Sequence, residues 1–213
     1  DDVHERQGSL KNPFNMDEDC QNCPALCETR NTVLHGYGDV GAEFLFISRH
    51  PDRGADKSGI PFGGERSGRT LLYILHELGL TRTGPAEHPP ELQNAFMTYL
   101  TRCHHPEREP TREELIACEP YLNAEIRMIN PEILVPIGEH TLQSLATEYT
   151  TRQPESFAID QVHATTVRGR GFELIPMKKL QRLDEAARDE FINHVVSNVF
   201  TRDYRQTKGR QNR

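Results

Sequence analysis

The chain has 213 residues, enough for one α/β domain with short extensions. Its 25 basic and 32 acidic residues give a formal net charge of −7, which argues against a uniformly basic nucleic-acid binder but allows a local basic face. No segment is long and apolar enough to form a transmembrane helix or a signal core, so we expect a cytoplasmic protein that does not bind membranes.

Apolar periodicity predicts strands and helices in alternation along the chain. Strands are expected at 43–49, 95–102, 132–137 and 172–177, and helices at 69–80, 112–129, 138–147 and 185–200. This order predicts a three-layer α/β/α fold around a central, mainly parallel, four-stranded sheet. The domain is expected to span 16–200, between an N-terminal extension at 1–15 and a basic tail at 201–213.

Two local signals refine the long helix at 112–129. Thr111 followed by Glu114 is a capping-box pattern that opens it. Pro120 lies inside it and is expected to kink or break it. In parallel sheets ligands bind beyond the carboxyl ends of the strands, so we expect the functional site among the loops at 50–67, 103–110 and 178–183.

Four cysteines form two widely separated pairs, Cys20 with Cys23 and Cys103 with Cys118. A C-x2-C turn can place two thiolates on one metal centre, with two further ligands coming from elsewhere in the fold. The spacing leaves zinc and an iron–sulfur cluster open, and the alternative is that all four are buried free thiols. The fifth cysteine, Cys27, belongs to neither pair.

Four features together resemble the uracil-DNA glycosylase superfamily, closest to its iron–sulfur branch, usually called family 4. They are the cysteine layout, the segment DKSGIPFGG at 56–64, the segment from Cys103 through Cys118 and the segment NPEILVPIG at 130–138. The resemblance implies a [4Fe–4S] cluster on Cys20, Cys23, Cys103 and Cys118, with zinc the second choice and Cys27 a spare. It also implies a pocket that holds a base flipped out of DNA, with Phe62 as the stacking aromatic.

The chain departs from the family pattern at the positions that carry the chemistry. Arg49 stands where the family has glutamate, and His50 where it has a small residue. Tyr99 replaces the asparagine that reads uracil, and Lys179 replaces the histidine that stabilises the departing base. The predicted base pocket is therefore Arg49, His50, Phe62 and Tyr99, and the candidate catalytic residues are His50, Asp52 and Lys179.

A nucleic-acid surface is predicted around the last strand. It comprises Leu180, as a wedge into the duplex, and the cationic residues Arg168, Arg170, Lys178, Lys179 and Arg182. The alternative for each cation is ordinary solvated surface.

These observations predict a nucleic-acid-binding superfamily member, acting on DNA rather than RNA, that excises a base other than uracil. The alternative is a catalytically inactive, cluster-bearing scaffold that binds DNA, RNA or a protein assembly. A protein-interaction module without nucleic acid is a third reading, which the acidic balance permits. A monomer, or a component of a larger assembly, is expected.

Overall fold

A computed structural model describes residues 7–64 and 66–202. In this part of the chain six strands form one sheet, in the order β1-β3-β2-β4-β6-β5. The strands are β1 (Tyr37–Gly38), β2 (Phe44–Ser48), β3 (Ala95–Tyr99), β4 (Ile133–Pro136), β5 (Val167–Arg168) and β6 (Glu173–Leu174). The predicted basic tail lies almost wholly outside the described residues, and the predicted domain bounds stay a prediction.

The four predicted strands form the parallel centre of the sheet. Phe44 at the start of β2 lies opposite Ala95 of β3 and Ile133 of β4, and β4 pairs in parallel with β6. The edge strands β1 and β5 are antiparallel to their neighbours. The prediction of a mainly parallel sheet is confirmed, and the two short edge strands are additions that it missed.

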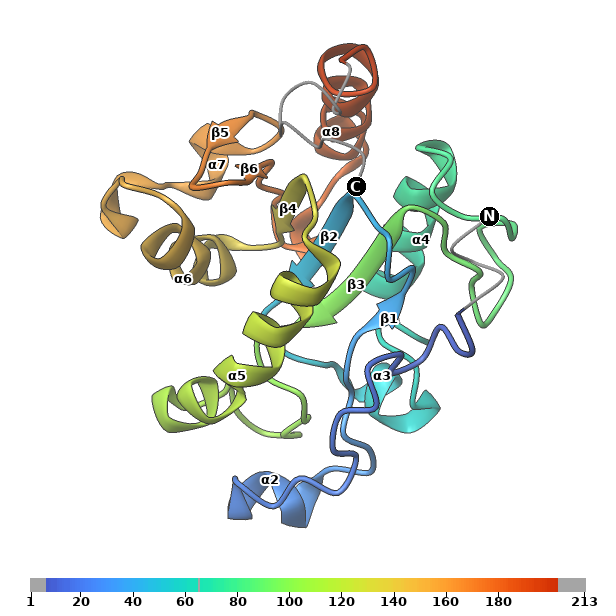
Figure 1. Ribbon diagram of the computed structural model, residues 1–213, viewed down its shortest axis with the longest axis vertical. Helices are drawn as coiled ribbons and strands as arrows, with labels where there is room; N and C mark the ends of the chain where they lie inside the picture. Colours follow the sequence, from blue (N-terminus) through green and yellow to red (C-terminus); the bar gives the residue numbers. More distant parts are fainter. Residues whose placement is uncertain (1–6, 65, 203–213) are drawn as a thin grey trace.

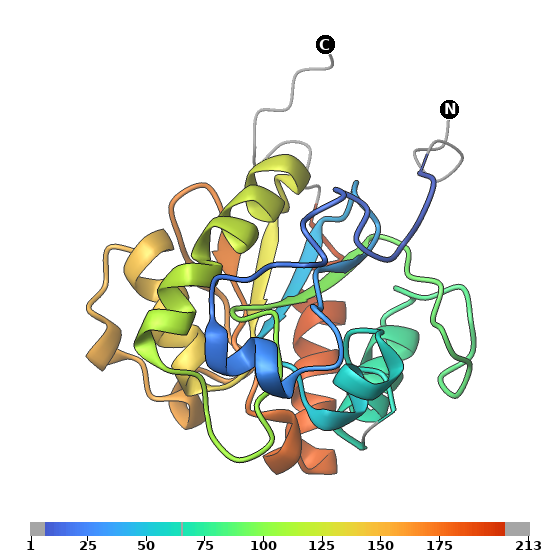
Figure 2. The ribbon, with the colours of Figure 1, turned by 90° about the horizontal axis from the view of Figure 1, so that it is seen from below.

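Helices cover both faces of this sheet. They are α2 (Pro24–Thr29), α3 (Arg53–Ser58), α4 (Arg66–Glu77), α5 (Arg112–Ile129), α6 (Glu139–Tyr149), α7 (Ile159–Val162) and α8 (Glu185–Asn198), with short 3-10 helices η1 (Pro154–Ser156) and η2 (Leu180–Arg182). Figures 1 and 2 show α4 and α8 on one face and α5 and α6 on the other. The predicted α/β/α layering is therefore confirmed.

Alternating side chains of the central strands build a core on each face. Phe44 and Phe46 of β2 pack toward α4 and α8, whereas Leu45 and Ile47 pack toward α5 and α6. All four side chains are almost completely buried. A strand that is apolar on both sides needs cover on both sides, which explains why the sequence reads as a continuous apolar run.

Helix α5 begins as predicted but does not break at Pro120. Thr111 accepts a hydrogen bond from the Glu114 backbone N–H, and the Glu114 carboxylate accepts one from the Thr111 N–H, which completes the capping box. The helix continues unbroken through Pro120 to Ile129. Pro120 is exposed, so water can serve the backbone carbonyl that loses its helical partner.

Candidate functional site

A cavity of about 140 Å³ lies at the carboxyl ends of the parallel strands. The arrowheads of β2 and β3 point toward this end of the molecule in Figure 1. The segments that follow β2, β3, β4 and β6 contribute its walls, as expected for a parallel sheet. Every residue predicted for the base pocket and for catalysis lines it: Arg49, His50, Asp52, Phe62, Tyr99 and Lys179. Their roles stay predictions.

Two stacked aromatic rings form one wall of the cavity. The ring centroids of Phe62 and Tyr99 are 4.7 Å apart, with an interplanar angle of 20°. The Phe62 backbone N–H donates to the Tyr99 hydroxyl oxygen over 2.6 Å. Phe62 is 5% exposed and Tyr99 2%. Tyr99 thus covers one face of the ring that the resemblance implies as the base-stacking aromatic, and little of Phe62 stays exposed although it lines the cavity.

The backbone at Phe62 is held in a conformation that a bulky residue rarely adopts. Its φ of 60° lies in the left-handed region. Helix α4 approaches so closely that a Cβ on Gly68 would collide with the Phe62 carbonyl oxygen, so only glycine fits there. Burial raises the pKa of Tyr99 well above its ordinary value, so this wall stays a neutral phenol.

Two basic side chains converge on one carboxylate at the cavity. Arg49 Nη1 and His50 Nε2 each lie 2.9 Å from Oε2 of Glu109. His50 Nδ1 is 3.0 Å from the Pro51 carbonyl oxygen, so both ring nitrogens face acceptors. Partial burial works to raise the pKa of Glu109, but His50, Arg49 and Lys179 together lower it.

Asp52 serves the local fold. Its Oδ1 accepts from the Ala55 backbone N–H over 2.8 Å, which caps α3, and its Oδ2 accepts from the Ser67 hydroxyl over 3.2 Å. The sequence made both His50 and Asp52 candidate catalytic residues. The structure pairs His50 with Glu109 instead, because Asp52 is committed to the cap.

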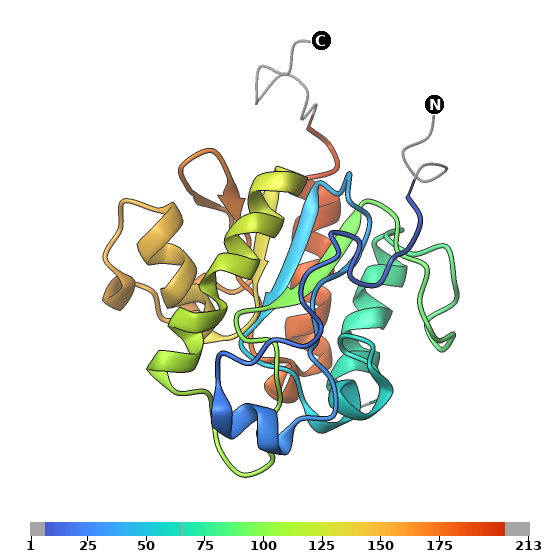
Figure 3. The same ribbon diagram turned by 60° about the horizontal axis from the view of Figure 1, so that its bottom comes forward.

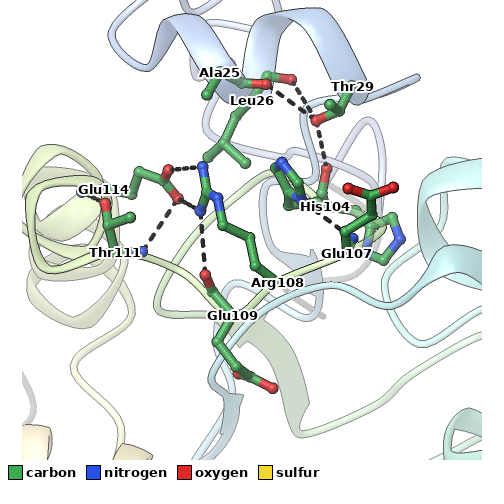
Figure 4. Close-up of polar contacts among 10 residues, drawn as sticks. Ala25, Leu26, Thr29, His104, Glu107, Arg108, Glu109, Thr111 and Glu114 are labelled. Carbon is green, nitrogen blue, oxygen red and sulfur yellow. Dashed lines mark hydrogen bonds and ion pairs between the residues drawn. The ribbon is translucent and has the colours of Figure 1, made fainter.

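The loop between β3 and α5 holds Glu109 in place, as Figure 4 shows. Arg108 donates to both carboxylate oxygens of Glu114 over 3.2 and 2.7 Å, and to the Glu109 carbonyl oxygen over 3.2 Å. On its other side the loop is tied to α2, where the Thr29 hydroxyl donates to the His104 carbonyl oxygen over 3.4 Å. The backbone that carries Glu109 is therefore anchored at both ends.

The first turn of α6 faces the same cavity. Gly138, with a φ of 88°, is the N-cap and provides no capping side chain. Residues 138–141 all line the cavity. Thr141 is 1% exposed, and its hydroxyl oxygen finds no hydrogen-bond partner within the described part of the chain. A buried, unpartnered hydroxyl at a helix N-terminus is unusual, because such groups normally cost free energy.

The predicted cationic rim is only partly at this end of the sheet. Lys179 and Arg182 are exposed beside the cavity. The ammonium group of Lys178 lies 3.9 Å from Asp160. Leu180 is buried in the core between α4 and the sheet, so it does not project as the predicted wedge; the short η2 turn directs it inward.

Arg168 and Arg170 do not belong to this rim. Arg168 pairs with Glu173, which lies level with Ile133 at the amino end of β4. The turn that carries Arg170 also lies beside Tyr149, where α6 ends. The antiparallel return of β5 therefore puts both arginines at the opposite end of the sheet from the cavity, and their prediction as part of the same DNA-facing rim is wrong.

Figure 3 shows α2 beside α5 and the loop after β3, and the five cysteines lie in or next to these segments of the sequence. All are free thiols, and Cys20, Cys103 and Cys118 are buried. Burial, followed by the charge of Cys118, raises the pKa of Cys23 to about 11. Burial likewise raises the pKa of Cys103 to about 12, with Cys118 and Cys20 contributing. The predicted ligand pairs therefore lie within electrostatic reach of one another.

The donor set consists of thiols, which both zinc and an iron–sulfur cluster accept as ligands. No three histidine, cysteine or acidic side chains among the described residues are arranged to hold one metal ion. Hydrogen bonds to the sulfurs are in place: Arg30 Nη1 lies 3.6 Å from Cys103 Sγ, and the Arg102 backbone donates to Cys118.

A buried ion pair braces the cysteine region against the sheet. Arg102 donates to both carboxylate oxygens of Glu125 over 3.0 and 2.7 Å, and both side chains are 1% exposed. Thr98 and the Gly36 backbone N–H donate to the same carboxylate over 2.7 and 3.0 Å. The Glu125 carboxylate is therefore satisfied by two further hydrogen bonds, whereas Arg102 Nε has no partner among the described residues.

Comparison with known proteins agrees with this architecture. The family profile of the uracil DNA glycosylase superfamily matches residues 35–196. The chain belongs to this superfamily. Type-4 uracil-DNA glycosylases are among its relatives, which confirms the predicted resemblance to the family 4 branch.

Three such relatives give the extent of the similarity. The protein of Saccharolobus solfataricus is 34% identical over 59% of this chain and 54% of its own length. That of Sulfurisphaera tokodaii is 32% identical over 72% of this chain and 61% of its length. That of Thermotoga maritima is 31% identical over 76% of this chain and 72% of its length. The chain thus spans little more than half the length of the first of these glycosylases. No helix within 7–64 or 66–202 is long and apolar enough to cross a membrane.

Sequence reasoning missed three residues of this superfamily member. Glu109 and Thr141 line the cavity. Glu109 lies in the segment from Cys103 through Cys118 but was not singled out there, and Thr141 lies outside all four features that carry the resemblance. Asp56 lies inside one motif, and its carboxylate accepts hydrogen bonds from Asn31 and the Thr32 backbone N–H, which fixes the segment after the cysteines to α3. In the sequence, Asp56 could have been noticed as a charged residue within a segment that otherwise has the composition of a turn.

Proposed function

We propose that this protein binds DNA at the carboxyl end of its sheet and does not excise uracil by the reaction expected of its superfamily. The packing of Tyr99 on Phe62 carries this proposal. Extruding a base costs a few kcal/mol, and an aromatic platform returns about 1–3 kcal/mol by stacking. Here one face of the platform is covered by a side chain of the protein itself, and Phe62 as a whole is only 5% exposed.

The hydrogen-bonding groups support the same conclusion. A uracil edge requires a partner that both donates and accepts, as an asparagine amide does. The Tyr99 hydroxyl already accepts from the Phe62 N–H. Arg49 and His50 are engaged with Glu109, and Lys179 stands where the resemblance implies a histidine. A site that lacks matched partners loses selection on the order of 10⁴-fold.

DNA binding rests on the family and on the cations beside the cavity. Lys179 and Arg182 are exposed at the end of the sheet where the superfamily resemblance places DNA. Phosphate contacts of this kind give affinity without sequence preference and weaken as salt rises.

We also propose that Cys20, Cys23, Cys103 and Cys118 hold a [4Fe–4S] cluster, with Cys27 as a spare and zinc as the second choice. When bound, the cluster supplies a covalent staple between the N-terminal segment and the centre of the domain. The chain's own contribution is to bury these thiols and to donate hydrogen bonds to them from Arg30 and the Arg102 backbone.

Excision of a base other than uracil is the second candidate. It is favoured by the contact of His50 Nε2 with Glu109, 2.9 Å apart at the cavity, because an imidazole beside a carboxylate can move a proton near neutral pH. Binding of RNA, a monomeric state, membership of a larger assembly and a cytoplasmic location stay predictions.

The test uses the full chain loaded with iron and sulfide under anaerobic conditions. Duplexes with one uracil and with thymine at the same position should bind equally, with an affinity that falls steeply as salt rises, and neither should acquire an alkali-labile site. An alkali-labile product at uracil would refute the proposal. A product at another modified base, lost in His50→Gln, would establish the second candidate; silence across a panel of deaminated and alkylated bases would remove it.

A matched pair of variants locates the DNA surface. Lys179→Glu with Arg182→Glu should weaken binding on the order of tenfold and flatten its salt dependence. Arg168→Glu with Arg170→Glu makes the same charge change at the opposite end of the sheet and should leave binding unaltered. If instead the Arg168 and Arg170 variant weakened binding and the Lys179 and Arg182 variant did not, the DNA surface would lie at the opposite end of the sheet.

A further inference from the structure

We propose that the strand-end cavity binds a phosphate monoester, such as the terminal phosphate of a DNA strand, between the first turn of α6 and the side chains of Arg49, His50 and Lys179. This inference rests on the proposed function, since it names what enters the same cavity. It differs from the family's use of the pocket, which takes a base.

The cavity has lost what a base requires. One face of its stacking ring is covered, because Tyr99 lies on Phe62 with 4.7 Å between ring centroids. The remaining volume is about 140 Å³, and its lining is rich in charged and hydroxyl-bearing residues. A compact, charged group suits such a space better than a planar base does.

The cations around it already hold an anion of the chain itself. Arg49 and His50 both contact one oxygen of Glu109 at 2.9 Å, and Lys179 adds to the positive charge around this carboxylate. The Glu109 side chain is 55% exposed, so it can swing out while the Arg108 clamp keeps its backbone in place. The Glu109 carboxylate thus occupies the position that a phosphate oxygen would take in the complex.

The other acids at the cavity do not oppose an incoming anion in the same way. Asp52 is held by the α3 cap and by Ser67. Glu139 accepts from the Ile159 backbone N–H over 3.2 Å, which draws its carboxylate toward α7. Glu109 is therefore the acid that a phosphate would displace.

Helix α6 supplies the independent observation. Its N-terminus opens onto the cavity without a capping side chain, and such a terminus attracts anions. Thr141, in the same turn, is 1% exposed and has an unpartnered hydroxyl within the described chain. The buried hydroxyl is explained if a ligand oxygen serves as its hydrogen-bond partner.

The test compares short duplexes of one sequence that end in 5′-phosphate, 3′-phosphate or hydroxyl groups, with binding followed by fluorescence anisotropy. A duplex with the preferred end phosphate should bind about tenfold more tightly than the hydroxyl-ended one, as expected for a charge-assisted hydrogen bond. Thr141→Val should abolish this difference, whereas Thr147→Val, on the exposed side of the same helix, should keep it. Glu109→Gln should tighten binding of the phosphorylated duplex several-fold.

Equal affinity for all three duplexes, or a preference that survives Thr141→Val, would overturn the inference and leave DNA binding intact. If no duplex binds, the proposed function fails, and inorganic phosphate decides the inference alone. A thermal stabilisation by phosphate that is lost in Thr141→Val would then support a free phosphate as the ligand. No stabilisation would overturn the inference as well.

Discussion

The cysteine region and the strand-end cavity share the loop after β3 but differ in how far they follow the family pattern. The cysteine region keeps the four cysteines that the resemblance implies as ligands, and Arg30 and the Arg102 backbone donate hydrogen bonds to two of them, Cys103 and Cys118. The cavity keeps the position and the Phe62 loop, but Arg49, His50, Tyr99 and Lys179 are not the residues that the resemblance would lead us to expect there. A scaffold can thus persist while the groups at its reactive edge are replaced.

The largest expected effect is at the cysteine region. Cys103→Ala should give colourless, poorly soluble protein, because metal binding is coupled to folding. Cys27→Ala, which removes the predicted spare, should keep the brown absorbance and the iron content. A Cys103→Ala protein with full iron would show that the ligand set is different.

The buried ion pair is the next test of this region. Glu125→Ala should destabilise the protein by about 3–5 kcal/mol, because it leaves the Arg102 charge buried without its partner. Glu113→Ala, at an exposed position of the same helix, should change stability by less than about 0.5 kcal/mol. Urea unfolding measures both, and similar values for the two would remove the bracing role of Glu125.

The cavity should respond less strongly. Tyr99→Phe keeps the stacked ring but removes the acceptor of the Phe62 N–H, which should cost about 1–3 kcal/mol. Tyr73→Phe, at a partly exposed position of α4, serves as the control in the same unfolding assay. An unchanged stability in Tyr99→Phe would mean that the hydroxyl does not hold the Phe62 loop.

The smallest effect is a pH dependence beside the rim. Burial, with the charge of Lys178, lowers the pKa of His163 from 6.5. Its Nε2 lies 2.7 Å from the Ala187 carbonyl, and its Nδ1 accepts from the Lys178 backbone N–H over 2.9 Å, as only the neutral ring can. The unfolded chain therefore takes up the proton first, so this stability is present above 6.5 and is lost as the pH falls through the lower folded value.

His163→Gln should flatten the fall of the unfolding midpoint between neutral and mildly acidic pH. His76→Gln, at a partly exposed position, should follow the wild-type profile. Identical profiles for all three proteins would exclude His163 as the group responsible.

The central strands and the layers could be predicted from the sequence, because apolar runs such as 43–49 reflect burial on both faces. The cavity residues could be placed at one edge of the sheet because they follow parallel strands, whose carboxyl ends lie at the same edge. The covering of Phe62 by Tyr99 could not, since it depends on a contact between residues 37 positions apart. Arg168 and Arg170 were misplaced because a polar, irregular segment gave no sign of the antiparallel return at β5.

The hydrogen bond between Phe62 and Tyr99 also bears on any attempt to place an asparagine, as the resemblance would lead us to expect, at position 99. Installing asparagine at position 99 alone would strip the Phe62 amide of its present acceptor and leave a hollow where a phenol ring had been packed. The Tyr99→Asn variant would therefore be less stable than the present protein. Compensating substitutions in the Phe62 loop would have to be made before asparagine is introduced at position 99.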